Sequence, residues 1–272
     1  MRRRLAAASA ALLLAVTATA AERPLLAAHR GGAAMWPENS LTAFRGAIAL
    51  GVDALEFDVH LTADGEAVVI HDATLDRTTT GHGPVRSLTL ERLQAVRLLD
   101  RSGAPTPDTV PTLAQVLELA RPTSIAVLPE IKLDLARLPY PDLEQRVVTL
   151  LRAHGLVTRA SVQSFDDGIV KRVRALEPAV RTMLLVNRLR MTTYASTPAD
   201  PVRWAVDAGA ADLGIDFRLI DARLLAAARA ASVRVAAWTV NADDDLRRMA
   251  ALGVDLVMSD RPDRARQLLV QP

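Results

Sequence analysis

Short apolar runs alternate with longer amphipathic segments along almost the whole chain after residue 21. The runs have the length of buried β-strands, whereas the longer segments place apolar residues at helical spacing, as in Leu113, Val116, Leu117 and Ala120. We predict strands at residues 25–29, 54–60, 68–71, 124–132, 160–165, 180–186, 211–215, 233–240 and 254–258. We predict helices at residues 40–50, 112–120, 143–154, 166–176, 201–208, 221–231, 242–251 and 261–270.

Repetition of strand–helix units over roughly 250 residues is typical of a parallel α/β architecture. Eight such units favour a closed (β/α)8 TIM barrel over an open doubly wound sheet. No glycine-rich nucleotide-binding motif follows the first predicted strand, which argues against a dinucleotide fold. We therefore expect one barrel domain over residues 22–272.

Residues 73–111 interrupt this alternation, because they are rich in Thr, Gly, Pro and Arg and contain no clear barrel element. We predict that they form a small insertion after the second barrel strand and lie over the barrel mouth. Such insertions often control access to a site.

The first 21 residues have the layout of a secretory signal peptide. Arg2, Arg3 and Arg4 precede an apolar stretch from Leu5 to Val16, and Ala18-Thr19-Ala20 offers a cleavage site. The alternative is an N-terminal helix or membrane anchor, for which the apolar stretch is shorter than the ~20 residues of a span. We expect export to the periplasm or secretion, with no stable membrane anchor after cleavage.

The charge balance changes when this segment is removed. The chain has 33 Lys and Arg against 31 Asp and Glu, and loss of three arginines leaves 30 against 31, a balance of −1. No long basic run follows, so we expect no binding to nucleic acid. Because the chain has no cysteine, disulfides and thiolate metal sites are excluded.

Two predicted strands carry acidic residues near their carboxyl ends. Glu56, Asp58 and His60 share one face of their strand, since side chains alternate with period two. Glu130 and Lys132 repeat the pattern after an apolar run. The alternatives are solvated strand charges or a buried salt bridge to Lys132. Three carboxylates without cysteine favour one hard divalent cation, Ca²⁺ or Mg²⁺.

Two histidines, His29 and His71, each stand at the end of a predicted strand. One can accept a proton from an attacking hydroxyl while the other protonates a leaving alcohol. Arg30 can bind a phosphate oxygen, and Gly31 and Gly32 allow the backbone to approach closely. Together these residues suit metal-assisted hydrolysis of phosphate esters. We expect the two remaining histidines outside strand 54–60, His82 and His154, to be surface residues.

Motifs spread over nearly the whole chain resemble those of the glycerophosphodiester phosphodiesterase family. The matching segments are H-R-G at 29, P-E-N-S-L-T-A-F at 37, E-F-D-V-H-L-T-A-D-G-E at 56, V-I-H-D-A-T-L-D-R-T-T-T-G at 69, E-I-K at 130, Q-S-F-D at 163, W-T-V-N at 238 and G-V-D-L-V-M-S-D-R-P at 253. Departures from the family pattern are minor. Ser40 replaces a more usual Thr, and Met258-Ser259 replaces a common Ile/Thr pair.

The resemblance implies the roles of individual residues. A divalent metal would lie on Glu56, Asp58 and Glu130, and His29 and His71 would be the acid/base pair. Arg30 and Lys132 would offset the developing charge, and Asn39 would support the site. Trp238 would line the glycerol subsite, unless it is a core aromatic. We expect Gln163 and Phe165 to pack rather than to contact the site.

The activity implied is hydrolysis of small glycerophosphodiesters to sn-glycerol 3-phosphate and an alcohol, through a cyclic phosphate formed by the glycerol 2-hydroxyl. One alternative is lysophospholipase D-like or phospholipase C-like cleavage of lipid phosphodiesters, which would require an apolar insertion or rim. Another is a non-catalytic protein that only binds glycerophosphoesters. The sequence leaves the head group, the choice of cation and the oligomeric state open.

Overall fold

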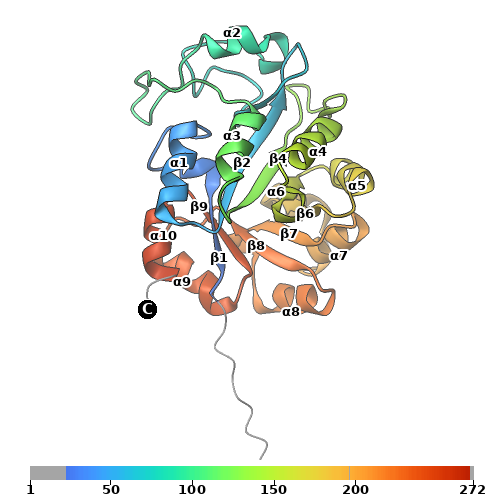
Figure 1. The fold of residues 1–272 in the computed structure, drawn as a ribbon. Helices are drawn as coiled ribbons and strands as arrows, with labels where there is room; N and C mark the ends of the chain where they lie inside the picture. Colours follow the sequence, from blue (N-terminus) through green and yellow to red (C-terminus); the bar gives the residue numbers. More distant parts are fainter. Residues whose placement is uncertain (1–22, 196, 270–272) are drawn as a thin grey trace, which may run out of the picture.

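Eight parallel strands close into a barrel in the computed structural model, which describes residues 23–195 and 197–269 (Figure 1). Around the barrel the order is β1-β9-β8-β7-β6-β5-β4-β2, and pairing of β1 with β2 closes the ring. The predicted (β/α)8 barrel is therefore confirmed. The strands are β1 (Leu25–Ala28), β2 (Ala54–Leu61), β4 (Ala126–Ile131), β5 (Ser161–Ser164), β6 (Arg181–Val186), β7 (Asp212–Asp216), β8 (Arg234–Trp238) and β9 (Leu256–Ser259).

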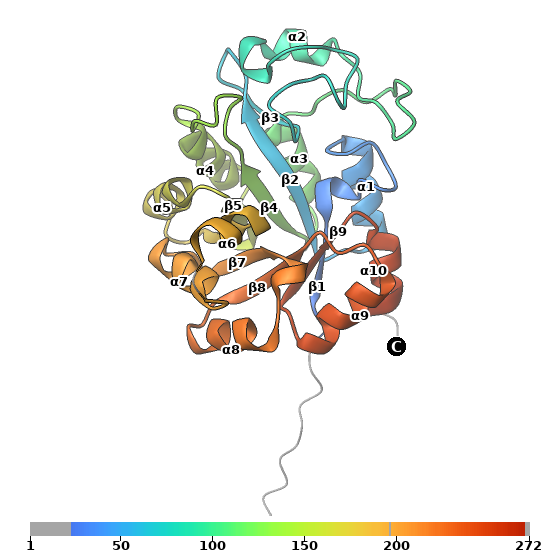
Figure 2. The same cartoon turned by 180° about the vertical axis from the view of Figure 1, so that it is seen from behind.

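Helices surround the barrel and follow the strands in the expected alternation (Figure 2). They are α1 (Leu41–Leu50), α3 (Leu113–Ala120), α4 (Leu143–Ala153), α5 (Asp167–Leu176), α7 (Asp200–Asp207), α8 (Ala222–Ala230), α9 (Asp243–Leu252) and α10 (Pro262–Leu269). Within residues 23–195 and 197–269, no helix has both the length and the apolar composition needed to cross a bilayer.

Side-chain caps fix where several helices begin. Ser40 accepts a hydrogen bond from the Ala43 amide, and Thr112 forms a reciprocal capping box with Gln115. These caps satisfy amides that the first helical turn leaves without partners. The predicted helices 40–50 and 112–120 therefore each begin one residue later than expected, because Ser40 and Thr112 are caps.

The structure corrects three local predictions. Strand β1 ends at Ala28, and His29 begins a short 3-10 turn, η1 (His29–Gly31). A short helix, α6 (Arg188–Tyr194), follows β6 and was missed because none of its residues is buried, so it has no apolar stripe. A five-residue helix, α2 (Leu90–Gln94), was missed for lack of length.

Apolar side chains fill two layers. The larger cluster lies where the helices pack on the strands and includes Phe44, Phe57 and Leu151. A second cluster contains Leu128, Met183 and their neighbours, contributed by alternate positions of the strands. The alternation explains why these strands are apolar on both faces.

Segment 73–111 follows β3 (Ala67–Val69), which pairs antiparallel with β2. It contains η2 (Val85–Ser87) and α2, and Figure 1 shows it, in teal, beyond the upper end of β2. Its apolar residues pack inward: Leu93 and Leu98 join Val68 and Ile70 in a separate buried cluster.

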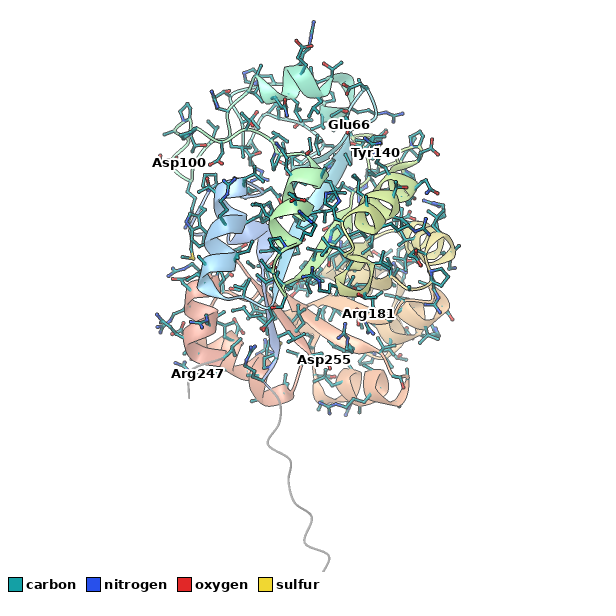
Figure 3. The ribbon with its side chains drawn as sticks, viewed as in Figure 1. Glu66, Asp100, Tyr140, Arg181, Arg247 and Asp255 are labelled. Carbon is teal, nitrogen blue, oxygen red and sulfur yellow. The ribbon has the colours of Figure 1, made fainter. Side chains whose placement is uncertain are left out.

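A buried charge cluster closes the amino end of the barrel. Asp212 is 1% exposed and accepts hydrogen bonds from Arg181, Arg234 and the Ser161 hydroxyl. Figure 3 marks this end by Arg181 and Asp255, well away from Tyr140 and Glu66 near the other end.

Candidate active site

Strand register brings three carboxylates together near the carboxyl end of the barrel. Asp58 on β2 lies beside Glu130 on β4, which in turn lies beside Gln163 on β5. Glu56, two residues before Asp58, shares its face. Glu56, Asp58 and Glu130 are 1%, 1% and 7% exposed, and each offers an oxygen within 4.8 Å of the others.

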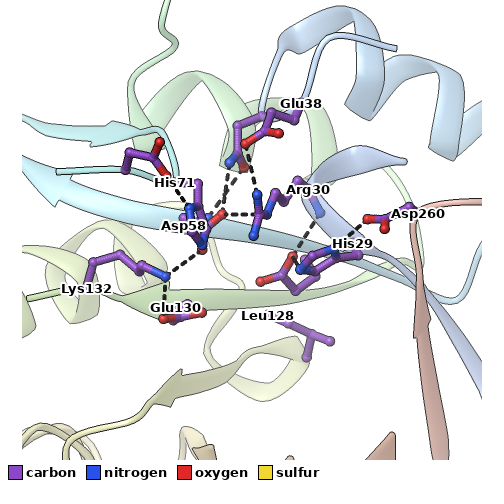
Figure 4. Close-up of polar contacts among 12 residues, drawn as sticks. His29, Arg30, Glu38, Asp58, His71, Leu128, Glu130, Lys132 and Asp260 are labelled. Atoms are coloured by element: carbon purple, nitrogen blue, oxygen red, sulfur yellow. Dashed lines mark hydrogen bonds and ion pairs between the residues drawn. The ribbon is translucent and has the colours of Figure 1, made fainter. Parts of the chain in front are cut away.

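Two cations contact this cluster but do not balance it. The Lys132 Nζ lies 2.7 Å from Glu130 Oε1 and 3.3 Å from Asp58 Oδ1, and the Arg30 Nε lies 3.5 Å from Asp58 Oδ2 (Figure 4). The predicted salt bridge to Lys132 therefore exists alongside the carboxylate cluster, so the two interpretations are not exclusive.

The cations are distributed unevenly among the acids. Burial alone would raise the pKa of Asp58, but Lys132 and Arg30 outweigh it and lower that pKa. Glu56 has no such cation pair. Burial, together with the charges of Asp58 and Glu130, raises the pKa of Glu56 to about 7. Burial also raises the pKa of Glu130.

The turn after β1 wraps around this cluster. Arg30 has φ 52°, and its amide donates to Glu56 Oε2 at 2.8 Å. A Cβ on Gly31 would lie 2.7 Å from that of Ala43, so this close approach requires glycine. Asn39, also at positive φ, donates from Nδ2 to Asp58 Oδ2 at 2.9 Å. The predicted support of the site by Asn39 thus takes the form of a direct contact with Asp58.

His29 lies on one side of the carboxylates and is held by Asp260 from the end of β9. Its Nδ1 is 2.6 Å from Asp260 Oδ1, and its Nε2 is 3.9 Å from Glu56 Oε2. Asn241 donates to the other oxygen of Asp260 at 2.7 Å. Burial opposes protonation of His29, but Glu56 and Asp260 outweigh it and raise its pKa.

His71 lies on the other side and has its own carboxylate. Its Nδ1 is 2.6 Å from Asp72 Oδ1. Burial lowers the pKa of His71, and the charges of Lys132 and Arg30 act in the same direction. Each histidine therefore donates Nδ1–H to a carboxylate, which fixes its ring and leaves Nε2 for chemistry.

Arg77, from segment 73–111, connects these parts. It donates to both oxygens of Asp72 at 2.6 and 3.0 Å and to both oxygens of Glu38 at 2.9 and 2.8 Å. Glu38 also accepts from Arg30 at 3.0 Å, so a chain of ion pairs runs from His71 to Arg30. Burial opposes ionisation of Asp72, but Arg77 and His71 lower its pKa to about 2.

His60 is buried, and both of its ring nitrogens form hydrogen bonds within the protein. Its Nε2 donates to the His71 carbonyl at 3.1 Å, and its Nδ1 accepts from the Tyr140 hydroxyl at 2.8 Å. Burial lowers the pKa of His60 to about 4, so the ring is neutral at physiological pH. It therefore supports the backbone of His71.

The two catalytic histidine candidates, two of the acids and both cations line a cavity of about 110 Å³: His29, His71, Glu56, Glu130, Arg30 and Lys132. Trp238 and Phe165 also line it, and their rings meet edge to face with centroids 5.6 Å apart. Gln163 also lines it and donates from Nε2 to Glu56 Oε1 at 2.9 Å. The expectation that Gln163 only packs was wrong, because its register beside Glu130 aims its amide at the carboxylates.

The carboxylate cluster has the chemistry of a hard-cation site. An ion with ligands at roughly 2.4 Å holds oxygens up to about twice that distance apart. The three carboxylates each offer an oxygen within 4.8 Å of the others, which is compatible with this limit. The raised pKa of Glu56 marks negative charge that Lys132 and Arg30 leave uncompensated. A buried Gln163 Oε1 without a hydrogen-bond partner adds a further oxygen beside Glu56. The residues present therefore fit a divalent cation.

The two histidines that were expected to lie on the surface differ in exposure. His82 is exposed, as expected, whereas His154 is partly buried and bonds the Leu150 carbonyl with Nδ1. The residues missed from sequence are Asp260, Asp72, Arg77 and Glu38. All four stand inside the matching motifs, but only the folded distances show that they hold the histidines and Arg30.

Comparisons with known proteins identify relatives that match almost the whole chain. The sequence profile described as the glycerophosphoryl diester phosphodiesterase family matches residues 29–264. A glycerophosphodiester phosphodiesterase of Caldanaerobacter subterraneus is 32% identical over 242 residues, which is 89% of this chain and 96% of that protein. One of Bacillus altitudinis is 32% identical over 247 residues, or 88% and 95% of the two chains.

A solved structure shows the same fold with a bound molecule. An Oleispira antarctica phosphodiesterase superposes with a TM-score of 0.76 at 26% identity, over 92% of this chain and 98% of that one. That protein was solved in complex with its product, sn-glycerol 3-phosphate.

Proposed function

This chain belongs to the glycerophosphoryl diester phosphodiesterase family and is a phosphodiesterase of that kind, and on this premise we propose its mechanism and substrate. It hydrolyses glycerophosphodiesters to sn-glycerol 3-phosphate and an alcohol, using one divalent cation and His29 and His71 as the acid/base pair. The observation that carries the proposal is the placement of two carboxylate-held histidines on either side of a buried three-carboxylate cluster.

The cavity supports a glycerol phosphate as the part of the substrate that is held. Arg30 and Lys132 line it together with Glu56 and Glu130, and Trp238 and Phe165 supply apolar surface. The cations suit a phosphate and the aromatic wall suits the carbon face of glycerol. The relative from Oleispira antarctica was solved with sn-glycerol 3-phosphate, which supports this class of ligand.

Glu56, Asp58 and Glu130 would hold the cation, and Ca²⁺ and Mg²⁺ both suit an all-carboxylate set. When bound, such a cation neutralises phosphate charge and lowers the pKa of a nearby hydroxyl. Lys132 and Arg30 keep Asp58 ionised and would offset charge that develops on the phosphate oxygens.

The histidines move the protons. One accepts the proton of the glycerol 2-hydroxyl at Nε2 while that oxygen bonds to phosphorus. The bond from phosphorus to the leaving alcohol breaks, and the other histidine donates its Nε2 proton to that oxygen. Water then opens the cyclic phosphate with the histidine roles exchanged. Asp72 and Asp260 keep Nδ1 protonated throughout, so each ring presents Nε2 to the reaction.

Lipid substrates are the second candidate, with lysophospholipase D-like or phospholipase C-like cleavage. Such substrates would require exposed apolar surface near the site. Segment 73–111 buries Leu93 and Leu98 in its own cluster and does not expose them for this purpose. Exposed leucines occur elsewhere beside the site, and this observation keeps an amphiphilic substrate in consideration. A non-catalytic role is disfavoured, because both histidines and all three carboxylates are present.

We also propose that the protein is exported through its first 21 residues, which lie outside the described residues. Sequencing the N-terminus of protein recovered from outside the cytoplasm should give Ala21 or Glu22 as the first residue, directly after the Ala18-Thr19-Ala20 site. A protein that still begins at Met1 would contradict cleavage at this position.

Release of sn-glycerol 3-phosphate from glycerophosphocholine tests the proposal. The mature protein is stripped with chelator and assayed with Ca²⁺, Mg²⁺ or no added metal. Release that depends on metal is expected in the wild type and should be lost in Glu130→Gln. Equal release without metal would reject the cation, and no release from folded protein would reject the substrate class.

A further inference from the structure

Exposed apolar side chains cluster beside the site. Of six large apolar residues exposed within the described ranges, two belong to the loop between β4 and α4 and two to α6. They are Leu135 and Leu138, 61% and 60% exposed, and Leu189 and Tyr194, 72% and 73% exposed. Single exposed leucines are common, but four on two neighbouring segments mark an interaction surface. We name these four residues the apolar rim.

Both segments follow the carboxyl ends of their strands, β4 and β6, and so lie on the face of the barrel that holds the site. The chain between them supplies Phe165 at the end of β5, the strand that separates β4 from β6. The rim residues are therefore not scattered over the molecule but flank one side of the candidate active site.

An open groove of about 500 Å³ connects this rim to the catalytic groups. Leu135 and Arg137 line it on one side, and Asn187, the N-cap of α6, lines it on the other. Its inner end reaches His71 and Lys132, which also line the smaller cavity. A molecule that enters through the rim therefore arrives at the proposed phosphate site.

Two arginines add positive charge beside the groove: Arg137 lines it, and Arg188 follows the lining residue Asn187 in the chain. Its two wall carboxylates outside the metal cluster are already paired, Asp72 with Arg77 and Asp134 with Arg86. By contrast, Arg137 and Arg188 are exposed and form no ion pair with any described residue. Exposed leucines and a tyrosine next to uncompensated arginines are the composition of a contact with anionic lipid.

We propose that the apolar rim, with Arg137 and Arg188, docks reversibly on an anionic lipid surface and admits amphiphilic glycerophosphodiesters through the groove. The inference rests on the proposed function, since the lipid surface would supply the phosphodiester that is cleaved. A lipid surface fits better than a protein or a second copy of this chain, because either of those would cover the opening through which substrate reaches His71.

Vesicle binding and turnover by the mature chain test this inference together. The variant carries Leu138→Ser, Leu189→Ser and Tyr194→Ser, none of which lines the groove or the smaller cavity. The matched control carries Leu25→Ser and Val206→Ser, the two large exposed apolar residues outside the rim in the described part of the chain. Vesicles contain phosphatidylglycerol and phosphatidylcholine in equal parts, with phosphatidylcholine alone for comparison.

The wild type and the control should bind the anionic vesicles, and the rim variant should bind at least tenfold more weakly. The rim variant should also cleave lysophosphatidylcholine held in those vesicles at least fivefold more slowly, while its turnover of soluble glycerophosphocholine stays unchanged. Binding should weaken on vesicles of phosphatidylcholine alone, because Arg137 and Arg188 then have no anionic partner.

Normal glycerophosphocholine turnover by a wild type that binds no vesicles would overturn the docking and leave the proposed function intact. Self-association that sedimentation detects in the wild type and not in the rim variant would also overturn it, in favour of a second copy. Absence of all turnover would reject the proposed function, and the vesicle assay would still decide the docking by itself.

Discussion

The two ends of this barrel both bury carboxylates, but they treat the charge in opposite ways. At the amino end, Asp212 is surrounded by Arg181, Arg234 and the Ser161 hydroxyl. At the carboxyl end, three acids share Lys132 and Arg30, and Glu56 has neither within ion-pair distance by its side chain. At the amino end, two arginines therefore surround one buried acid. At the carboxyl end, two cations are shared among three buried acids.

The pKa shifts follow this difference. Burial would raise the pKa of Asp212, but Arg234 and Arg181 outweigh it and lower that pKa. At the other end burial and neighbouring acids raise the pKa of Glu56 to about 7. A buried carboxylate that is paired with cations keeps its charge without a ligand. A buried carboxylate that lacks such partners is typical of a site where a bound cation supplies the missing positive charge.

The largest effect expected at the carboxyl end is on catalysis. His71→Ala should lower turnover of glycerophosphocholine by about 10²–10⁴-fold, because a general acid or base is lost. The unfolding transition should change little, since His71 is partly exposed. His82→Ala is the control, as that exposed histidine of the same segment is predicted to affect neither property. Comparable turnover in the two variants would remove His71 from the mechanism.

Stabilisation by metal should depend on the carboxylates at the carboxyl end and not on Asp212. Adding cation to a hundredfold excess over its Kd should raise the free energy of unfolding by about 2.7 kcal/mol, as measured by urea denaturation. Glu130→Gln should abolish this increase because it removes one of the three carboxylates. Asp212→Asn should keep it, and loss of the increase in Asp212→Asn would show that the two ends are coupled.

Asp212→Asn should instead lower the free energy of unfolding by about 2 kcal/mol at neutral pH. The figure is below the 3–5 kcal/mol typical of broken buried pairs, because Arg181 and Arg234 are partly exposed and regain water. Turnover per folded molecule should stay unchanged. Asp244→Asn, an exposed residue paired with Arg247, is the control and should have no measurable effect.

The effect of Asp212 should depend on pH. Its pKa is lower in the folded protein than the ordinary value of 3.8, so its stabilisation is fully present above that value and is lost as pH falls through the folded pKa. The difference between wild type and Asp212→Asn should therefore be largest near neutral pH and should shrink in strongly acidic solution. A difference that grows on acidification would contradict the charge pairing.

The smallest effect concerns Arg77, which links His71 to Arg30 through Asp72 and Glu38. Arg77→Lys should lower kcat by about tenfold or less with KM nearly unchanged, since a lysine cannot pair with both Asp72 and Glu38 in the forked geometry. Arg101→Lys is the control, because Arg101 in the same segment bonds only the Ala34 carbonyl among described residues. An equal effect in both variants would make the role of Arg77 a general one in holding the segment.

Sequence patterns predicted most of the barrel and the reactive groups of the site. Helices and strands with an apolar stripe were found because burial imposes a period of 3.6 or 2 on them. Helix α6 was missed because it lies on the surface and carries no such stripe. The contact of Gln163 with Glu56 cannot be predicted from neighbouring residues, because it depends on the register of β2, β4 and β5.

Hydrogen bonds between residues that are far apart in the sequence could not be predicted from sequence patterns. Asp260 lies 231 positions after His29, and nothing near either residue indicates that they share a hydrogen bond. The place of the exposed apolar side chains is a second case. Leu93 and Leu98 of segment 73–111 fill a local core, whereas Leu135, Leu138 and Leu189, which follow β4 and β6, stay exposed.

The sequence by itself determined the barrel architecture, the family and the identity of the acids, histidines and cations at the strand ends. Those features depend on neighbouring residues, whose periodicity and order are written along the chain. Only the tertiary structure decided which acid is paired with a cation, which histidine is held by which carboxylate and where apolar surface stays exposed. Those features depend on distance and burial in three dimensions, because Coulomb energies and desolvation change over a few ångströms.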